Sequence, residues 1–265
     1  MKPIELNTLD LCIAALLVLF DAAISMRLGL RLHRQVLWAA ARMVIQLLLV
    51  GLVLRAVFTW GSQIATLGVI VLMIAAAARE VAVRPARRLA GWPGYRISTT
   101  VVSFASIATV LLALLTAIRP TPWYDPRYAI PLMGIVLGSI LNSASLGLDT
   151  FFSSITGARA AIEGRLALGA TRGEALTPYV RNAIRSGLIP IINQMSAAGI
   201  ITLPGIMTGQ MLAGMDPVEA VKYQILLMFL LAGGSGLAAL GVVYMAAASI
   251  TDSRHRLRLE RLTRG

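Results

Sequence analysis

Apolar residues occur along this chain in long, nearly continuous runs. The runs approach or exceed the ~20 residues that a helix needs to cross ~30 Å of hydrocarbon. A β-barrel would require alternating apolar and polar positions, which these runs lack. The pattern therefore predicts an all-α, polytopic transmembrane helical bundle. About seven spans are expected, near residues 9–26, 37–58, 64–78, 97–118, 129–149, 185–204 and 221–250.

Composition supports this fold class and charge orients it. Apolar residues make up 57% of the chain and charged residues 14%, with a mean hydropathy of +0.78. The net charge is +12, and the arginines gather after the first, third and fifth spans and at the C-terminus. The positive-inside rule then predicts a multi-pass protein of the inner (plasma) membrane, with the N-terminus outside and the C-terminus cytoplasmic. No basic domain with interleaved aromatic residues is present, so a nucleic-acid partner is not expected.

Two joints between the spans have distinct signals. The outer joint 119–131 contains four prolines and is predicted to be an irregular loop. The longest cytoplasmic joint, 150–184, contains Gly169, which can end a helix in a left-handed conformation. Thr171 and Glu174 then match a T-x-x-E capping box.

Pro178 should end the helix that this capping box begins, because the residue before a proline disfavours the α region. The result is an isolated helix of about two turns, suited to docking a soluble partner. A capped helix without any partner is the alternative.

Several motifs resemble those of one family of ABC-transporter permeases. Glu163, followed by Leu168-Gly169-Ala170-Thr171, resembles the "EAA…G" signature whose coupling helix sits in a cleft of the ATPase subunit. Gly164-Arg165 depart from that signature, where Ala-Ala is usual. FetB-like iron-export permeases and their plant aluminium-tolerance relatives have motifs similar to LALGAT (166–171), RNAIRSGLIP (181–190), LPGIMTG (203–209), AGMDP (213–217) and AVKYQI (220–225).

This resemblance implies a transport subunit rather than an enzyme. It implies a single transmembrane permease domain over 1–265, with 150–184 as its coupling segment. The domain would pair with a second copy and with a separate ATPase that binds ATP-Mg, and it would bind no cofactor itself. The chain has no GxxxxGK[ST] motif for ATP. The exported substrate would be iron or another metal ion, and a nucleotide sugar or other small organic molecule is the alternative. The implied coupling residues are Glu163, Leu168, Gly169, Ala170, Thr171, Arg172 and Glu174.

Polar residues within spans are costly and usually face the bundle interior. They either line a pathway or join helices by hydrogen bonds. The apolar run that breaks at Leu203-Pro204-Gly205 either lines a cavity or ends a helix at the outer face. Nearby methionines are either soft metal ligands or core filler. The candidate pathway residues are Arg42, Gln46, Asn142, Asn193, Gln194, Pro204, Gly205, Met207 and Met211.

Three carboxylates are weak metal candidates. Asp21 and Asp149 are expected near cytoplasmic span ends, where they could attract a cation or be ordinary interfacial charges. Asp216 precedes Pro217 and is predicted to cap the last helix rather than to release metal. The sequence assigns no definite metal ligands.

Two other membrane classes fit the sequence less well. Gly233-Gly234-Ser235-Gly236 matches the GxSG of intramembrane rhomboid proteases. The chain's histidines, His33 and His255, fall in cytoplasmic joints, so the serine would lack a base. A retinal protein would need a buried lysine, whereas Lys222 is expected at the outer edge of the last span. The GGSG run is therefore expected to be a point of close helix packing.

Overall fold

The structure is a computed structural model that describes residues 7–252 and 256–264. The chain divides into an N-terminal unit, Met1–Ser62, and a C-terminal unit, Gln63–Gly265. The N-terminal unit is a helical hairpin of α1 (Thr8–Arg27) and α2 (His33–Trp60). None of the most apolar stretch of α2 is buried within the structure. An apolar surface of this extent requires lipid or protein to cover it.

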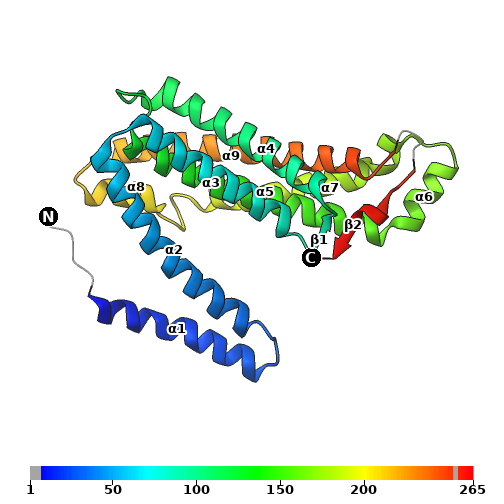
Figure 1. Ribbon diagram of the computed structural model, residues 1–265, viewed down its shortest axis with the longest axis horizontal. Coiled ribbons are helices and arrows are strands. Elements are labelled where there is room, and N and C mark those ends of the chain that lie inside the picture. Colours follow the sequence, from blue (N-terminus) through cyan, green and yellow to red (C-terminus); the bar gives the residue numbers. More distant parts are fainter. Residues whose placement is uncertain (1–6, 253–255, 265) are drawn as a thin grey trace. The chain divides into compact units, whose positions relative to one another are not determined.

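In the C-terminal unit, five long helices run alongside one another (Figure 1). Helix α6 and a two-stranded sheet lie at one end of this bundle, and α8 lies at the other. The elements are α3 (Gln63–Val83), β1 (Arg87–Leu89), α4 (Trp92–Leu112) with its π-helical extension η1 (Ala113–Ile118), α5 (Pro126–Gly157), α6 (Arg159–Ala167), α7 (Arg172–Ala197), α8 (Gly205–Leu212), α9 (Pro217–Ser249), the 3-10 turn η2 (Leu259–Arg261) and β2 (Leu262–Arg264).

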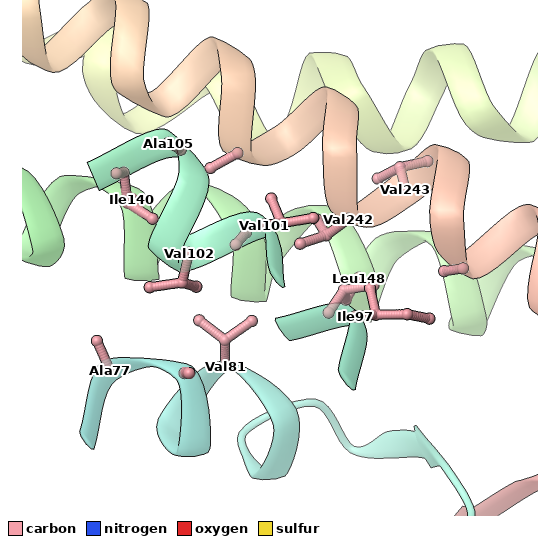
Figure 2. Packing of buried hydrophobic residues seen from close by; sticks show 14 of the residues in the cluster. Ala77, Val81, Ile97, Val101, Val102, Ala105, Ile140, Leu148, Val242 and Val243 are labelled. Carbon is pink, nitrogen blue, oxygen red and sulfur yellow. The ribbon is translucent and has the colours of Figure 1, made fainter. Parts of the chain in front are cut away.

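The core of this unit surrounds α5, which packs against α3, α4, α7 and α9. Val81 of α3, Val102 of α4 and Val242 of α9 are fully buried (Figure 2). Many of the other buried residues are alanines, such as Ala105 and Ala144. Small side chains let helices approach closely, which is the usual means of association within a bilayer.

Six described helices are long and apolar enough to cross a membrane, which confirms the all-α, polytopic fold class. They contain every predicted span except 185–204. Residues 185–197 of that span lie in α7, which carries Arg172, Glu174, Arg181 and Arg185 within its first fourteen residues. Helix α7 nevertheless runs between the two ends of the bundle beside α5 and α9 (Figure 1). The predicted end at 204 is wrong, because the helix stops at Ala197 and Ala198 is extended. The sides on which the termini lie remain predictions.

The predicted loop 119–131 is wrong in its second half. Helix α5 begins at Pro126, and the Asp125 carboxylate accepts a hydrogen bond from the Arg127 N–H at 2.9 Å. Proline at the first helical position costs nothing, because its missing donor would be unsatisfied there anyway. Pro131 is accommodated inside the helix, whose neighbouring Ile130 and Leu132 are buried in the core. Packing thus outweighs the local effect of the proline.

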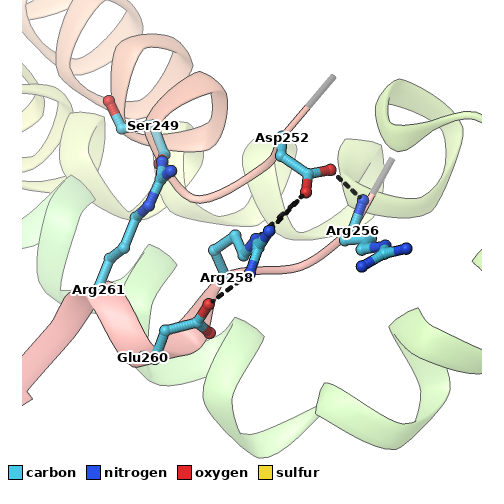
Figure 3. Close-up of polar contacts among 6 residues, drawn as sticks. All are labelled: Ser249, Asp252, Arg256, Arg258, Glu260 and Arg261. Atoms are coloured by element: carbon cyan, nitrogen blue, oxygen red, sulfur yellow. Dashed lines mark hydrogen bonds and ion pairs between the residues drawn. The ribbon is translucent and has the colours of Figure 1, made fainter. Parts of the chain in front are cut away.

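The C-terminal tail folds back on the bundle. Strand β2 pairs antiparallel with β1, so that Arg88 lies opposite Thr263. Arg258 contacts the carboxylates of Asp252 and Glu260, each at 3.1 Å (Figure 3). Arg261 donates a hydrogen bond to the Ser249 carbonyl at the end of α9. Arg258 and Arg261 therefore have structural partners in addition to their part in the positive-inside bias. Arg254 and His255 lie outside the described residues.

Candidate functional site

The predicted helix end at Gly169 is confirmed. Gly169 adopts φ +92°, in the left-handed region that favours glycine. Its N–H donates to the Leu166 carbonyl, and the Ala170 N–H donates to the Arg165 carbonyl, both at 3.1 Å. This pair of bonds is a Schellman motif, which satisfies the last carbonyls of α6. The chain therefore turns sharply from α6 into α7.

The predicted capping box is also confirmed. The Glu174 N–H donates to Thr171 Oγ1 at 3.3 Å, and the Thr171 N–H donates to Glu174 Oε2 at 2.8 Å. The backbone bond from Thr171, aided by its hydroxyl, holds the pKa of Glu174 below its ordinary value. The carboxylate is therefore charged at neutral pH and completes the start of α7.

The isolated two-turn helix is wrong. Helix α7 continues from Arg172 through Pro178 and Pro190 to Ala197. Leu176 and Val180, on either side of Pro178, are both buried, so continuing the helix keeps both in the core. The preceding Thr177 hydroxyl donates to the Gly173 carbonyl at 2.7 Å. The element at this end of the bundle is therefore a corner between α6 and a long helix.

We call residues 159–174 the coupling corner, after the role that the sequence resemblance implies for them. Its tip is apolar and open, since Leu168 is 90% exposed. Glu163 is exposed too and pairs with Arg159 at 2.8 Å along α6. Its base is fixed, because Ile162 is 1% exposed and belongs to the core. Arg172 begins α7 and is exposed, and Ala170 is half-buried. The corner thus presents an exposed apolar side chain on an anchored base.

Two predicted polar residues, Asn142 and Asp149, lie together in a cavity of about 420 Å³. Arg84 Nη1 donates to Asn142 Oδ1 at 3.2 Å. The Ala86 N–H donates to Asp149 Oδ1 at 2.9 Å. Ser145, also in the lining, is 6% exposed, and its hydroxyl has no hydrogen-bond partner within the described residues. We call this set the polar cavity.

The sequence missed Arg84 as a member of the polar cavity and assigned it only to the cytoplasmic charge bias. No local signal marks it, because its partner Asn142 lies 58 positions further along the chain.

A second cavity, of about 550 Å³, lies where α7 breaks. The chain turns at Gly199, which has φ +87°, and Pro204 is the N-cap of α8, which begins at Gly205. The break therefore lines a cavity. Met195 of α7, Met207 of α8 and Met228 of α9 all border it, as does Gln224. No sequence signal marks Met228 or Gln224, because both lie within the uninterrupted apolar helix α9. Met211 is half-buried on α8.

The remaining pathway candidates are scattered. Asn193 and Gln194 are exposed on α7, beyond Pro190 of the polar cavity. Arg42 and Gln46 are exposed one turn apart on α2 of the N-terminal unit.

The other carboxylate candidates do not form a shared site. Asp21 is exposed on α1. Asp216 caps α9 as predicted, accepting from the Val218 and Glu219 N–H groups at 2.9 and 3.3 Å. Within the described ranges, no three His, Cys, Asp or Glu side chains gather as a metal site.

The GGSG run is a packing point. A β-carbon on Gly234 would lie 3.1 Å from Thr109 Oγ1. Ser235 is fully buried, and its hydroxyl lies 2.8 Å from that of Ser139. The serine is therefore engaged in joining α9 to α5.

Comparison with known proteins identifies the family. Residues 8–250 match the profile described as "Uncharacterised protein family (UPF0014)". The chain is 42% identical over 234 residues to the UPF0014 membrane protein slr1647 of Synechocystis sp., covering 86% of this chain and 87% of that protein. It is 30% identical over 248 residues to the "Probable iron export permease protein FetB" of Escherichia coli, covering 94% and 93%.

A plant relative, the UPF0014 membrane protein STAR2 of rice, is 32% identical over 232 residues, covering 88% of this chain and 79% of that protein. No solved structure matches the chain. The resemblance to FetB-like permeases and their plant relatives is confirmed. This multi-pass membrane protein belongs to the UPF0014 family.

Proposed function

We propose that the chain is the membrane-spanning permease subunit of an ABC-type exporter, powered by a separate ATPase subunit. The coupling corner carries this proposal. An exposed leucine at the tip of a rigid corner suits insertion into a cleft of a soluble partner, because burying it removes apolar surface from water. The capped start of α7 links that tip to the whole length of the bundle. The name of the E. coli relative, a probable permease, supports the same role.

The proposed assembly contains two copies of the chain and two ATPase subunits. ATP-Mg would bind only on the ATPase subunits. ATP-driven closure of those subunits would bring the two coupling corners together and reorient the helices attached to them. The chain itself would bind no nucleotide for hydrolysis.

The proposed substrate is iron or another metal ion. This part of the proposal rests on the name of the E. coli relative. Asp149 and Asn142 could offer oxygen ligands to a cation in the polar cavity. A small organic anion such as a nucleotide sugar is the second candidate. Arg84 favours it, because a guanidinium repels a bare cation and binds phosphate well.

Coupling can be tested by substituting the corner's exposed tip. The test requires co-expression with the partner ATPase, and an ATPase gene beside the gene for this chain would supply the candidate. Leu168→Asp should abolish co-purification of the ATPase while membrane insertion is retained. Leu212→Asp is the matched control, since Leu212 is 76% exposed at the opposite end of the C-terminal unit. Equal ATPase recovery with both variants would refute the docking role.

Substrate identity needs a separate measurement. The reconstituted complex should be assayed for ATPase stimulation by ferrous iron, by other divalent metals and by nucleotide sugars. Stimulation by metals alone supports metal export. Stimulation by nucleotide sugars without any metal response would overturn it in favour of the organic substrate.

A further inference from the structure

A cleft between α7 and α9 has not been assigned a role. Its volume is about 320 Å³, and Leu176 and Val180 of α7 are buried along it. Ala247 and Thr251 line it from the other side, and the Thr251 hydroxyl is already bonded to the Ala247 carbonyl at 3.0 Å. The floor of the cleft is therefore largely apolar.

The charged groups that line this cleft are both positive. Arg172 and Arg181 of α7 line it, together with the hydroxyl-bearing Tyr244 of α9. No carboxylate is among its lining residues. Asp252, the next residue beyond Thr251, is held by Arg258 at 3.1 Å. The cleft is thus a basic rim above an apolar floor.

Its position along the helices corresponds to a membrane boundary. Helix α9 is long and apolar enough to span, and no charged residue lies between Lys222 and Asp252. Arg185 is the last charged residue of α7 before Ala197. Arg181 therefore lies just outside the apolar stretch of α7, and Tyr244 lies within the last turns of the apolar stretch of α9, eight residues before Asp252. Arginine and tyrosine are favoured at this depth, where the headgroups of the bilayer begin.

We propose that this cleft binds the headgroup of an anionic phospholipid. Arg181 would donate charge-assisted hydrogen bonds to the lipid phosphate, for which the fork of a guanidinium is well shaped. Tyr244 is 60% exposed, and its hydroxyl would add a neutral hydrogen-bond donor. The apolar floor would accept the glycerol and the start of an acyl chain. A free phosphate would use the rim alone, whereas a phospholipid would use both the rim and the floor.

The test measures binding of fluorescent phosphatidylglycerol to the purified full-length chain in uncharged detergent. R181Q should weaken binding about tenfold, the loss expected for one charge-assisted hydrogen-bonding group. R185Q is the control, because Arg185 is exposed one turn further along the same helix and does not line the cleft. Y244F, which retains the ring, should weaken binding about threefold.

Competition then separates the sources of the phosphate. Phosphatidylcholine and millimolar inorganic phosphate should both fail to displace the bound lipid. Equal losses in R181Q and R185Q would overturn the proposal, since they would show only general charge attraction. Displacement by inorganic phosphate, or by the partner ATPase, would also overturn it by identifying a free-anion or a protein site. The result is independent of transport and of coupling to an ATPase.

Discussion

A β-carbon built on Gly187 would lie 2.7 Å from the carbonyl oxygen of Ser143, so α7 and α5 cross with their main chains in contact. The same β-carbon would lie 3.2 Å from the Ala239 β-carbon of α9. Three helices therefore meet where α7 has no side chain. Glycine is required here because a β-carbon would displace the Ser143 carbonyl oxygen, which belongs to the backbone and cannot rotate away.

Gly187→Ala should therefore separate the helices and lower stability by about 1–3 kcal/mol, the usual cost of overpacking a core. The measurement is the midpoint of thermal unfolding in detergent. Gly138→Ala is the control, because a β-carbon there meets no atom within 4 Å. An equal midpoint for the two variants would contradict the close crossing.

Gly169→Val should distort the coupling corner, since a β-branched residue is strained at φ +92° by about 1–3 kcal/mol. We expect the variant to insert in the membrane but to lose stimulation of the partner ATPase. Gly164→Ala on α6 is the control, because Gly164 has no positive φ and a β-carbon added to it would meet no atom within 4 Å. Normal stimulation of Gly169→Val would show that the turn is not needed for coupling.

Glu163→Lys removes an exposed ion pair with Arg159 and creates like charges one turn apart. Exposed pairs contribute about 0–1 kcal/mol, so thermal stability should change little. We nevertheless expect ATPase coupling to be lost, because the partner ATPase would meet a positive charge at Lys-substituted position 163 in place of a negative one. Glu163→Gln, which adds no positive charge, should retain most of it. A large drop in thermal stability in Glu163→Lys would instead indicate a structural role.

The capping box predicts a dependence on pH. Because the folded state lowers the pKa of Glu174, its carboxylate stabilises the fold above the ordinary glutamate pKa of about 4.3. This contribution is lost as the pH falls through the lowered native value. The difference in thermal midpoint between wild type and Glu174→Ala should therefore be present at pH 7 and shrink below about pH 4. A difference that is constant from pH 7 to pH 3 would contradict this role for the charge.

Asp149→Ala should loosen the segment between α3 and α4, because the Ala86 N–H loses its acceptor. Amide hydrogen exchange over residues 84–91 should accelerate about tenfold, the equivalent of one hydrogen bond. Asp149→Asn retains an acceptor oxygen and should exchange close to the wild-type rate. Unchanged exchange in Asp149→Ala would show that other contacts hold this segment.

Local signals in the sequence were reliable where the chain is exposed. Gly169, the Thr171–Glu174 box and Asp216 act through neighbours within a few residues, so their roles could be read from the sequence alone. Six of the seven predicted spans likewise follow from hydropathy, which acts without regard to tertiary contacts.

Signals that depend on packing were missed or misread. Pro178 and Pro131 do not end their helices, because buried neighbours on both sides hold the helical path. Arg84 joins Asn142 across 58 positions of sequence, and nothing local announces such a pair. Met195, Met207 and Met228 border one cavity only because α7 breaks seven residues before the expected point.

The continuity of α7 has a mechanical consequence. At 1.5 Å per residue its 26 residues form a rod of about 39 Å that joins the coupling corner to the methionine-lined cavity. The contact at Gly187 divides the rod into arms of roughly 22 and 15 Å. Under the proposed coupling role, a helix that pivoted there would convert a push at the corner into an opposite movement of about two-thirds that size at the cavity. A movement at one end of α7 would then be transmitted to its other end by rotation of the helix about the close contact at Gly187.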